Sequence, residues 1–245
     1  MGSRGALAPA SLLSVVIPAY NEEPNVEPCY RELAEVLAAL GRPCEVIFVD
    51  DGSTDGTFRV LAGLAAADPR VRVIRFRRNA GQTAGLDAGF RAARGAVVVT
   101  MDADLQNDPR DIPALLERLQ SYDAVCGWRV SRQDPWSKRM GSRVANAVRR
   151  RFTGDGVHDT GCMLKAFRRS ALDRLRLYRG MHRFLPALLR LEGCRVTEVP
   201  VRHRRRRAGR SKYGNWSRLW VGLADLWAVR WMARRRLEYE IAEER

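Results

Sequence analysis

The sequence has no apolar run of about 18 residues, so it offers no candidate for a transmembrane helix. The N-terminus, MGSRGALAPASLL, lacks the long apolar segment of a secretory signal peptide, and we interpret residues 1–11 as a flexible tail. No internal repeat and no low-complexity linker is found. The 245 residues suffice for one large domain with a sizeable core.

Cysteine and histidine are scarce. The five cysteines form no C-x-x-C pair, and the three histidines are scattered along the chain. The odd cysteine count and this spacing argue against a disulfide framework and against a zinc site, and they favour a reducing compartment.

Acidic residues are few relative to basic ones, with 28 Asp and Glu against 43 Lys and Arg, which gives a net charge of +15. Such an excess predicts an anionic partner: nucleic acid, an anionic membrane or a phosphorylated substrate. An RNA-binding protein would show exposed aromatic residues on a sheet face or a known motif, and neither is found. We therefore predict that nucleic acid is not a partner.

The first half of the chain alternates between strand and helix patterns. Strand patterns occur at 12–20, 44–50, 71–76 and 96–101, and helical patterns at 26–41, 57–67, 83–95 and 111–120. This alternation predicts an α/β fold with a mostly parallel central sheet flanked by helices. The second half is less regular, with predicted strands at 122–129, 160–167 and 195–201 and predicted helices at 136–152 and 181–192.

Polar clusters follow the predicted strands at the points where they end. They are Tyr20-Asn21-Glu22, Asp50-Asp51, Arg78-Asn79 and Asp102-Ala103-Asp104. Each cluster alone also fits a turn or a helix cap. Because ligands bind at the carboxyl ends of strands in parallel sheets, four clusters at successive strand ends indicate a binding site at one rim.

Asp102 and Asp104 come directly after the apolar run AVVVTM. Two carboxylates so close together are costly when both are ionised, unless a cation lies beside them. The alternative is that they cap the following helix or face solvent. With Gln106 they offer hard oxygen ligands for Mg²⁺ or Mn²⁺, and a substrate diphosphate would complete the coordination shell.

Several segments resemble family 2 glycosyltransferases of the GT-A fold, a Rossmann-like nucleotide-diphospho-sugar transferase fold. They are SVVIPAYNEE, EVIFVDDGSTDGT, NAGQTAGLDAGF and MDADLQNDP, in this order. Further segments resemble the polyprenyl-phosphate branch of the family, which includes dolichol-phosphate mannose synthase and bacterial undecaprenyl-phosphate sugar transferases: GWRVSRQDPWSKRMGSRVANAV, DTGCMLKAF and HRRRRAGRSKYG. The resemblance implies a GT-A domain over residues 12–214, followed by a C-terminal amphipathic helix within 215–245.

The resemblance also implies a reaction: metal-dependent, inverting transfer of a sugar, mannose foremost, from GDP-mannose or a UDP-sugar to dolichyl or undecaprenyl phosphate. It assigns donor contacts to Pro18, Tyr20, Glu22, Val49, Asp51, Asp102, Ala103 and Asp104. It assigns the metal to Asp102, Asp104 and Gln106, and the acceptor phosphate to Arg129, Ser142, Arg143, Arg206 and Lys212. The residues that it makes catalytic are Asp102, Asp104, Arg129, Arg206 and Lys212.

The C-terminal segment places apolar residues within an arc of about 120° on a helix, although Arg230 falls in the same arc. They are Trp216, Leu219, Trp220, Leu223, Trp227 and Trp231. Tryptophan favours the bilayer interface, and Arg234–Arg236 suit anionic headgroups, so one expectation is a membrane-surface helix. The other is a helix that packs on the catalytic domain or on a partner. The first expectation places the protein in the cytoplasm, peripheral at the inner face of the membrane, with a transmembrane partner protein as an option.

Two other functions remain open at this point. One is a family 2 transferase that acts on another envelope lipid or saccharide acceptor. The other is a non-catalytic membrane-surface protein with a degenerate transferase fold. The intact segments D-A-D-L-Q and R-x-x-G-x-S-K argue against the second alternative.

Overall fold

The computed structural model describes residues 11–130, 152, 156–204, 215–236 and 243, with 215–221 described for the backbone only. Residues 1–10 of the predicted tail and most of the predicted helix at 136–152 lie outside this range. So do four predicted acceptor residues: Ser142, Arg143, Arg206 and Lys212.

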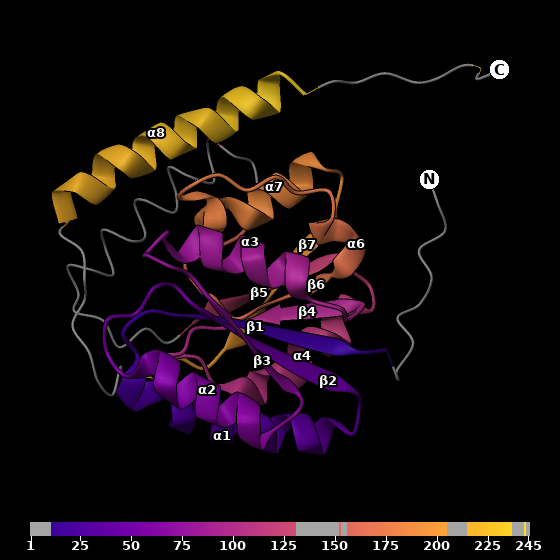
Figure 1. The fold of residues 1–245 in the computed structure, drawn as a ribbon. Helices are drawn as coiled ribbons and strands as arrows, with labels where there is room; N and C mark the ends of the chain where they lie inside the picture. Colours follow the sequence, from indigo (N-terminus) through magenta and orange to yellow (C-terminus); the bar gives the residue numbers. More distant parts are fainter. Residues whose placement is uncertain (1–10, 131–151, 153–155, 205–214, 237–242, 244–245) are drawn as a thin grey trace.

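A seven-stranded sheet with the order β3-β2-β1-β4-β6-β5-β7 forms the centre of the fold (Figure 1). The strands are β1 (Leu13–Ala19), β2 (Cys44–Asp50), β3 (Val71–Arg75), β4 (Val97–Thr100), β5 (Ala124–Arg129), β6 (Lys165–Arg168) and β7 (Val196–Val201). The pairs β1–β2, β1–β4, β2–β3 and β5–β7 are parallel, whereas β6 is antiparallel to both β4 and β5. The predicted mostly parallel sheet is confirmed, and the carboxyl ends of β1, β2, β4 and β5 share one edge.

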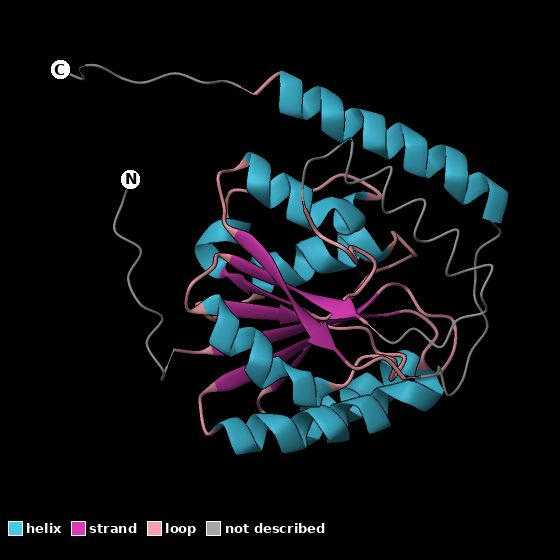
Figure 2. Cartoon of the chain, turned by 180° about the vertical axis from the view of Figure 1, so that it is seen from behind, coloured by secondary structure: helices cyan, strands magenta, loops and turns pink. Residues whose placement is uncertain are grey.

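Helices cover both faces of the sheet, as Figures 1 and 2 show from opposite sides. The elements on one face are α1 (Glu23–Leu40), α2 (Thr57–Ala67), the 3₁₀ turn η1 (Pro109–Asp111) and α4 (Ile112–Leu119). Those on the other are α3 (Gln82–Ala92), α6 (Arg169–Leu172), the 3₁₀ turn η2 (Met181–Phe184) and α7 (Leu185–Leu191), with α8 (Asn215–Arg234) lying outside α7.

The strands are apolar along their whole length because helices pack on both faces of the sheet. Successive residues of a strand point to opposite faces. Val15 and Ile17 of β1 accordingly pack in the core beneath α1, while Val16 packs in the core beneath α3. Because both faces are buried, the strands read as continuous apolar stretches rather than as alternating ones.

The predicted strand at 160–167 is wrong in its extent, since β6 begins only at Lys165. The carbonyl oxygens of Thr160 and Cys162 accept hydrogen bonds from the buried Lys165 ammonium group. These carbonyls therefore serve a buried cation instead of a neighbouring strand. The predicted helices at 111–120 and 181–192 are each present as a 3₁₀ turn followed by an α-helix.

Helix α8 contacts the domain through a face that differs from the predicted tryptophan arc. Leu226 and Val229 are buried against residues of η2 and α7. On the arc, Leu223 is 44% exposed, Trp227 68% and Trp231 52%. The helix thus packs on its own domain and still presents an apolar face outward.

Two further expectations are addressed by the described residues. All five cysteines are free thiols, as the cysteine spacing predicted. Across the described ranges, no helix has both the length and the apolarity needed to cross a membrane.

Candidate functional site

The predicted donor residues of β1 and β2 meet at the shared edge of the sheet. Pro18 and Val49 are register partners, and Ala19 pairs with Asp50. Val49 is fully buried, and Pro18 packs so closely on α3 that a Cβ added to Gly85 would lie 3.2 Å from the Pro18 Cβ. Pro18 and Val49 therefore lie at the carboxyl ends of β1 and β2, and Tyr20, Glu22 and Asp51 lie in the loops that follow these strands.

The loop after β1 is fixed by hydrogen bonds to the loop after β2. Asn21 has a left-handed backbone with φ of 51°, and its N–H donates to Ser53 Oγ at 2.9 Å. The Glu22 N–H donates to Thr57 Oγ1 at 2.9 Å. Ser53 and Thr57, both in the segment EVIFVDDGSTDGT, thus fix the loop that carries the half-buried Tyr20 and the buried Glu22 at the rim.

Asp51 is buried and holds the segment that precedes α3. Its carboxylate accepts hydrogen bonds from the Ala80 N–H at 2.7 Å, the Gly81 N–H at 2.9 Å and Asn79 Nδ2 at 2.9 Å. Burial raises the pKa of Asp51 and outweighs the backbone hydrogen bonds that lower it. Asp51 is therefore a structural anchor of the rim, and its predicted contact with a nucleotide stays a prediction.

The turn after Asp51 requires glycine. Gly52 has a left-handed φ of 70°, and a Cβ there would lie 2.5 Å from the backbone carbonyl carbon of Arg78. Because Gly52 has no side chain, the loop after β2 packs directly against the backbone of the loop after β3 at Arg78 and Asn79.

Asp102, Asp104 and Gln106 lie on one short loop after β4. The Asp102 N–H donates to Asn107 Oδ1 at 2.9 Å, and Asp102 Oδ1 accepts from Gln82 Nε2 at 2.9 Å. Asp104 Oδ1 accepts the Gln106 N–H at 3.1 Å. Leu105, with a left-handed φ of 63°, reverses the chain between them. The three predicted metal ligands thus lie within five residues of one loop, and their binding of a metal stays a prediction.

The charges of this loop make the rim electronegative. The pKa of the buried Cys29 thiol is raised to about 12, first by burial and then by Asp104, Glu32 and Asp102. An anionic diphosphate would be repelled here unless a cation lay between it and the carboxylates. Two carboxylates and an amide fit a hard divalent cation such as Mg²⁺ or Mn²⁺. The described residues hold no group of three or more His, Cys, Asp or Glu side chains arranged for a metal ion.

Arg129, the last residue of β5, lies at the same edge and is held by Asp159. Arg129 Nε donates to Asp159 Oδ2 at 2.6 Å and Nη2 donates to Oδ1 at 2.9 Å, with the two side chains only 12% and 6% exposed. Burial alone lowers the pKa of Arg129, but Asp159 and, more weakly, Asp102 raise it above its usual value. The rim therefore carries a fixed, partly buried cation within the field of Asp102.

Sequence reasoning missed three residues that position the site: Gln82, Asn107 and Asp159. All three lie inside the motif segments NAGQTAGLDAGF, MDADLQNDP and DTGCMLKAF, which was the available signal. Their partners are 20, 5 and 30 residues away in the chain, and only the fold reveals such pairings.

A model of glycosyl transferase family 2 matches residues 14–176 of the sequence, which include β1–β4 and the loop with Asp102 and Asp104. The chain belongs to glycosyl transferase family 2.

Curated relatives of this family 2 chain include a dodecaprenyl-phosphate galacturonate synthase from Rhizobium johnstonii, 39% identical over 230 residues, which are 91% of the chain and 67% of the relative. An undecaprenyl-phosphate 4-deoxy-4-formamido-L-arabinose transferase from Pseudomonas aeruginosa is 42% identical over 207 residues, which are 84% of the chain and 61% of the relative. The chain thus spans about two thirds or less of the length of these relatives.

Solved structures support the GT-A fold. Glucosyl-3-phosphoglycerate synthase from Mycobacterium tuberculosis, in complex with Mn²⁺, uridine diphosphate and phosphoglyceric acid, aligns with a TM-score of 0.66 at 21% identity, over 93% of this chain and 80% of that one. The mannosyltransferase PcManGT from Pyrobaculum calidifontis, in complex with GDP-Man and Mn²⁺, aligns with a TM-score of 0.64 at 22% identity. The alignment covers 94% of this chain and 66% of that one. The predicted GT-A fold is confirmed.

Proposed function

We propose that this family 2 glycosyltransferase moves a sugar from a nucleotide sugar to a polyprenyl phosphate, with Mg²⁺ or Mn²⁺ bound at Asp102, Asp104 and Gln106. The observation that carries the proposal is the pairing of opposite charges on one rim. The acidic loop suits a metal-bound donor diphosphate, and the fixed cation Arg129 suits a second phosphate beside it. The names of the two curated relatives support a polyprenyl-phosphate acceptor.

The chemistry needs little from the protein beyond positioning and charge. A phosphate monoester loses its second proton with a pKa of about 6, so the acceptor is largely a dianion near neutral pH and needs no general base. Its oxygen forms a bond to the anomeric carbon. The bond from that carbon to the donor diphosphate breaks, the leaving nucleoside diphosphate keeps the electron pair, and the sugar is inverted. A bound divalent cation would stabilise the charge on the leaving group.

Repulsion between the two phosphate groups is the main obstacle to this step. Arg129 offsets it from β5, where Asp159 holds the guanidinium in place before the substrates arrive. By family resemblance, Ser142, Arg143, Arg206 and Lys212 serve the acceptor phosphate as well.

The transferred sugar is the open part of the proposal. GDP-mannose is the first donor to test because the sequence resembles mannose synthases. Nucleotide forms of galacturonate and of 4-deoxy-4-formamido-L-arabinose come next, since two relatives are named for these sugars.

The decisive experiment is a transfer assay with the full chain. It uses vesicles containing undecaprenyl or dolichyl phosphate, Mn²⁺ or Mg²⁺, and each radiolabelled donor in turn. We expect one donor to deliver label into the lipid phase, and EDTA to stop the transfer. If a nucleotide sugar binds with metal but no label reaches the lipid, the acceptor assignment is wrong and saccharide acceptors follow. Binding without turnover on any acceptor would indicate a non-catalytic protein.

We further propose that the outward face of α8 lies on the membrane surface where the lipid acceptor is found. Trp227 and Trp231 are exposed on this face, and Arg234–Arg236 follow as exposed cations. Replacing Trp227 and Trp231 with serine should reduce binding to anionic phosphatidylglycerol vesicles at least about tenfold, since each buried apolar side chain contributes about 1.5–3 kcal/mol.

Vesicle flotation measures this effect, with Trp128→Ser as the matched control because Trp128 is a partly exposed tryptophan that belongs to β5 and not to α8. Equal flotation of the wild type and the double variant, together with a change in oligomeric state, would instead make this face a protein contact.

A further inference from the structure

Glu198, a residue of β7 to which no motif assigns a role, binds the segment that carries Asp159. The Glu198 side chain is 9% exposed, and its carboxylate accepts three hydrogen bonds. Oε2 accepts from the His158 N–H at 2.7 Å and from His158 Nδ1 at 2.9 Å, and Oε1 accepts the Asp159 N–H at 3.0 Å. Both oxygens of Glu198 therefore hold two consecutive residues of the chain.

Asp159 in turn holds Arg129. Its carboxylate accepts hydrogen bonds from Arg129 Nε at 2.6 Å, from Arg129 Nη2 at 2.9 Å and from the Gly161 N–H at 3.1 Å. Glycine at position 161 leaves room for the guanidinium, since a Cβ there would lie 3.0 Å from Arg129 Nη2. The position of Arg129 therefore depends on where the backbone of residues 158–161 lies.

This backbone is held by side chains rather than by regular secondary structure. Residues 156–164 belong to no helix and to no strand. The Lys165 ammonium group donates to the carbonyl oxygens of Thr160 and Cys162, near the end of the segment. Glu198 accepts the N–H groups near its start. Loss of the Glu198 contact would therefore free the part of the segment that includes Asp159.

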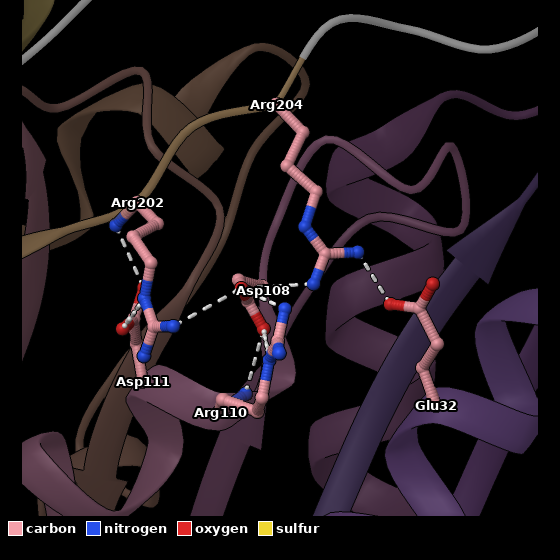
Figure 3. Close-up of polar contacts among 6 residues, drawn as sticks. All are labelled: Glu32, Asp108, Arg110, Asp111, Arg202 and Arg204. Carbon is pink, nitrogen blue, oxygen red and sulfur yellow. Dashed lines mark hydrogen bonds and ion pairs between the residues drawn. The ribbon is translucent and has the colours of Figure 1, made fainter.

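β7 gives Glu198 a fixed base, although it is an edge strand of the sheet. All six residues of β7 pair with β5 in parallel register. Figure 3 shows ion pairs just beyond the end of β7, where Arg202 and Arg204 contact Asp108. Because Arg129 is the last residue of β5, Glu198 and Arg129 stand on neighbouring strands, and residues 158–161 connect them.

We propose that Glu198 is a positioning residue of the transfer reaction. It fixes the backbone of His158 and Asp159, so that Asp159 holds the Arg129 guanidinium at the rim before the acceptor phosphate binds. The proposal rests on the proposed function, in which Arg129 offsets the charge of the acceptor. Glu198 itself contacts neither substrate, because its buried carboxylate is engaged by the three donors.

Glu198→Gln tests this role because it turns one carboxylate oxygen into an amide nitrogen, which donates and cannot accept. The N–H of His158 or of Asp159 would then face a donor, and the segment would shift. The kcat/KM for undecaprenyl phosphate should fall at least about tenfold, since a misplacement of about 1 Å can cost about 10²-fold. The Kd for UDP or GDP with Mn²⁺, whichever the active donor carries, should change less than about threefold by tryptophan fluorescence. The donor loop keeps its own contact between Gln82 and Asp102.

Three further variants define the cause of the defect. His158→Ala removes the ring but keeps both backbone N–H groups that Glu198 accepts, so transfer should stay within about threefold of the wild type. Glu117→Gln makes the same chemical change on an exposed residue of α4 and should leave transfer unchanged. Glu198→Asp keeps the charge but is one methylene shorter. It should reproduce the acceptor defect, and it serves as the test if Glu198→Gln folds poorly.

A double variant shows whether Glu198 acts through Arg129. In Arg129→Gln the guanidinium is absent, so Glu198 has no cation left to position. The kcat/KM of Arg129→Gln/Glu198→Gln should therefore lie within about twofold of that of Arg129→Gln alone. A general structural role would instead lower the rate by the same factor with and without Arg129.

The outcomes separate this proposal from the proposed function. Wild-type protein that transfers no sugar to undecaprenyl phosphate would overturn both. Wild-type transfer would overturn the positioning role alone if Glu198→Gln and Glu198→Asp match the wild type, or if Glu198→Gln lowers the rate equally in the Arg129→Gln background. A defect in His158→Ala as large as that in Glu198→Gln would also overturn it, because the ring rather than the backbone would then be responsible.

Discussion

Replacing Asp104 with asparagine is expected to lower the rate of sugar transfer by about three orders of magnitude. Asparagine keeps the oxygen that accepts the Gln106 N–H, so the loop retains its shape. It removes the negative charge that would bind the metal. Metal ions stabilise transition-state charge by several kcal/mol, and about 4 kcal/mol corresponds to about a thousandfold in rate. The measurement is kcat/KM for the active donor at fixed Mn²⁺, with the melting temperature recorded in parallel.

Asp87→Asn is the matched control for this prediction. Asp87 lies on α3 and forms an ion pair with Arg91 on the helix surface, so its loss should leave transfer unchanged. The metal assignment also predicts that the Mn²⁺ concentration for half-maximal activity rises in Asp104→Asn. A thousandfold slower enzyme with an unchanged Mn²⁺ requirement would show that Asp104 acts on the substrate without the metal.

Replacing Arg129 with glutamine is expected both to destabilise the protein and to slow transfer. Asp159 is 6% exposed, and removing its partner leaves a buried carboxylate without its main ion pair, which costs about 3–5 kcal/mol. For a protein of this size that should lower the melting temperature by about 10 °C. Transfer should fall at least about a hundredfold, since the acceptor dianion would lose its fixed cation.

The double variant Arg129→Gln/Asp159→Asn separates these two effects. It replaces the buried ion pair with two neutral amides, which should restore most of the melting temperature. Transfer should stay low if Arg129 offsets phosphate charge. Recovery of both stability and transfer would mean that Arg129 serves only as the structural partner of Asp159.

Much of the fold was predictable because its determinants are local. The alternation of apolar strand runs with helical spacing at 12–20, 26–41 and 44–50 matches β1, α1 and β2 within a few residues. Helix α1 ends at Leu40 and is capped by Gly41, whose φ of 61° is left-handed. The parallel sheet brings the strand-end clusters to one edge, as their positions in the sequence indicated, while the metal-binding role of Asp102, Asp104 and Gln106 stays a prediction.

The sequence by itself therefore determined the fold class, the family and the acidic loop, because strand and helix periods and short motifs are written in neighbouring residues. Only the tertiary structure decided what those residues touch. It paired Asp51 with the loop before α3, Arg129 with Asp159, and Asp108 with Arg204, which lies 96 positions along the chain from it. It also decided that α8 packs through Leu226 and Val229 and leaves Trp227 outward. Such pairings depend on which charges and surfaces the packed sheet brings within a few ångströms, and no local periodicity encodes that.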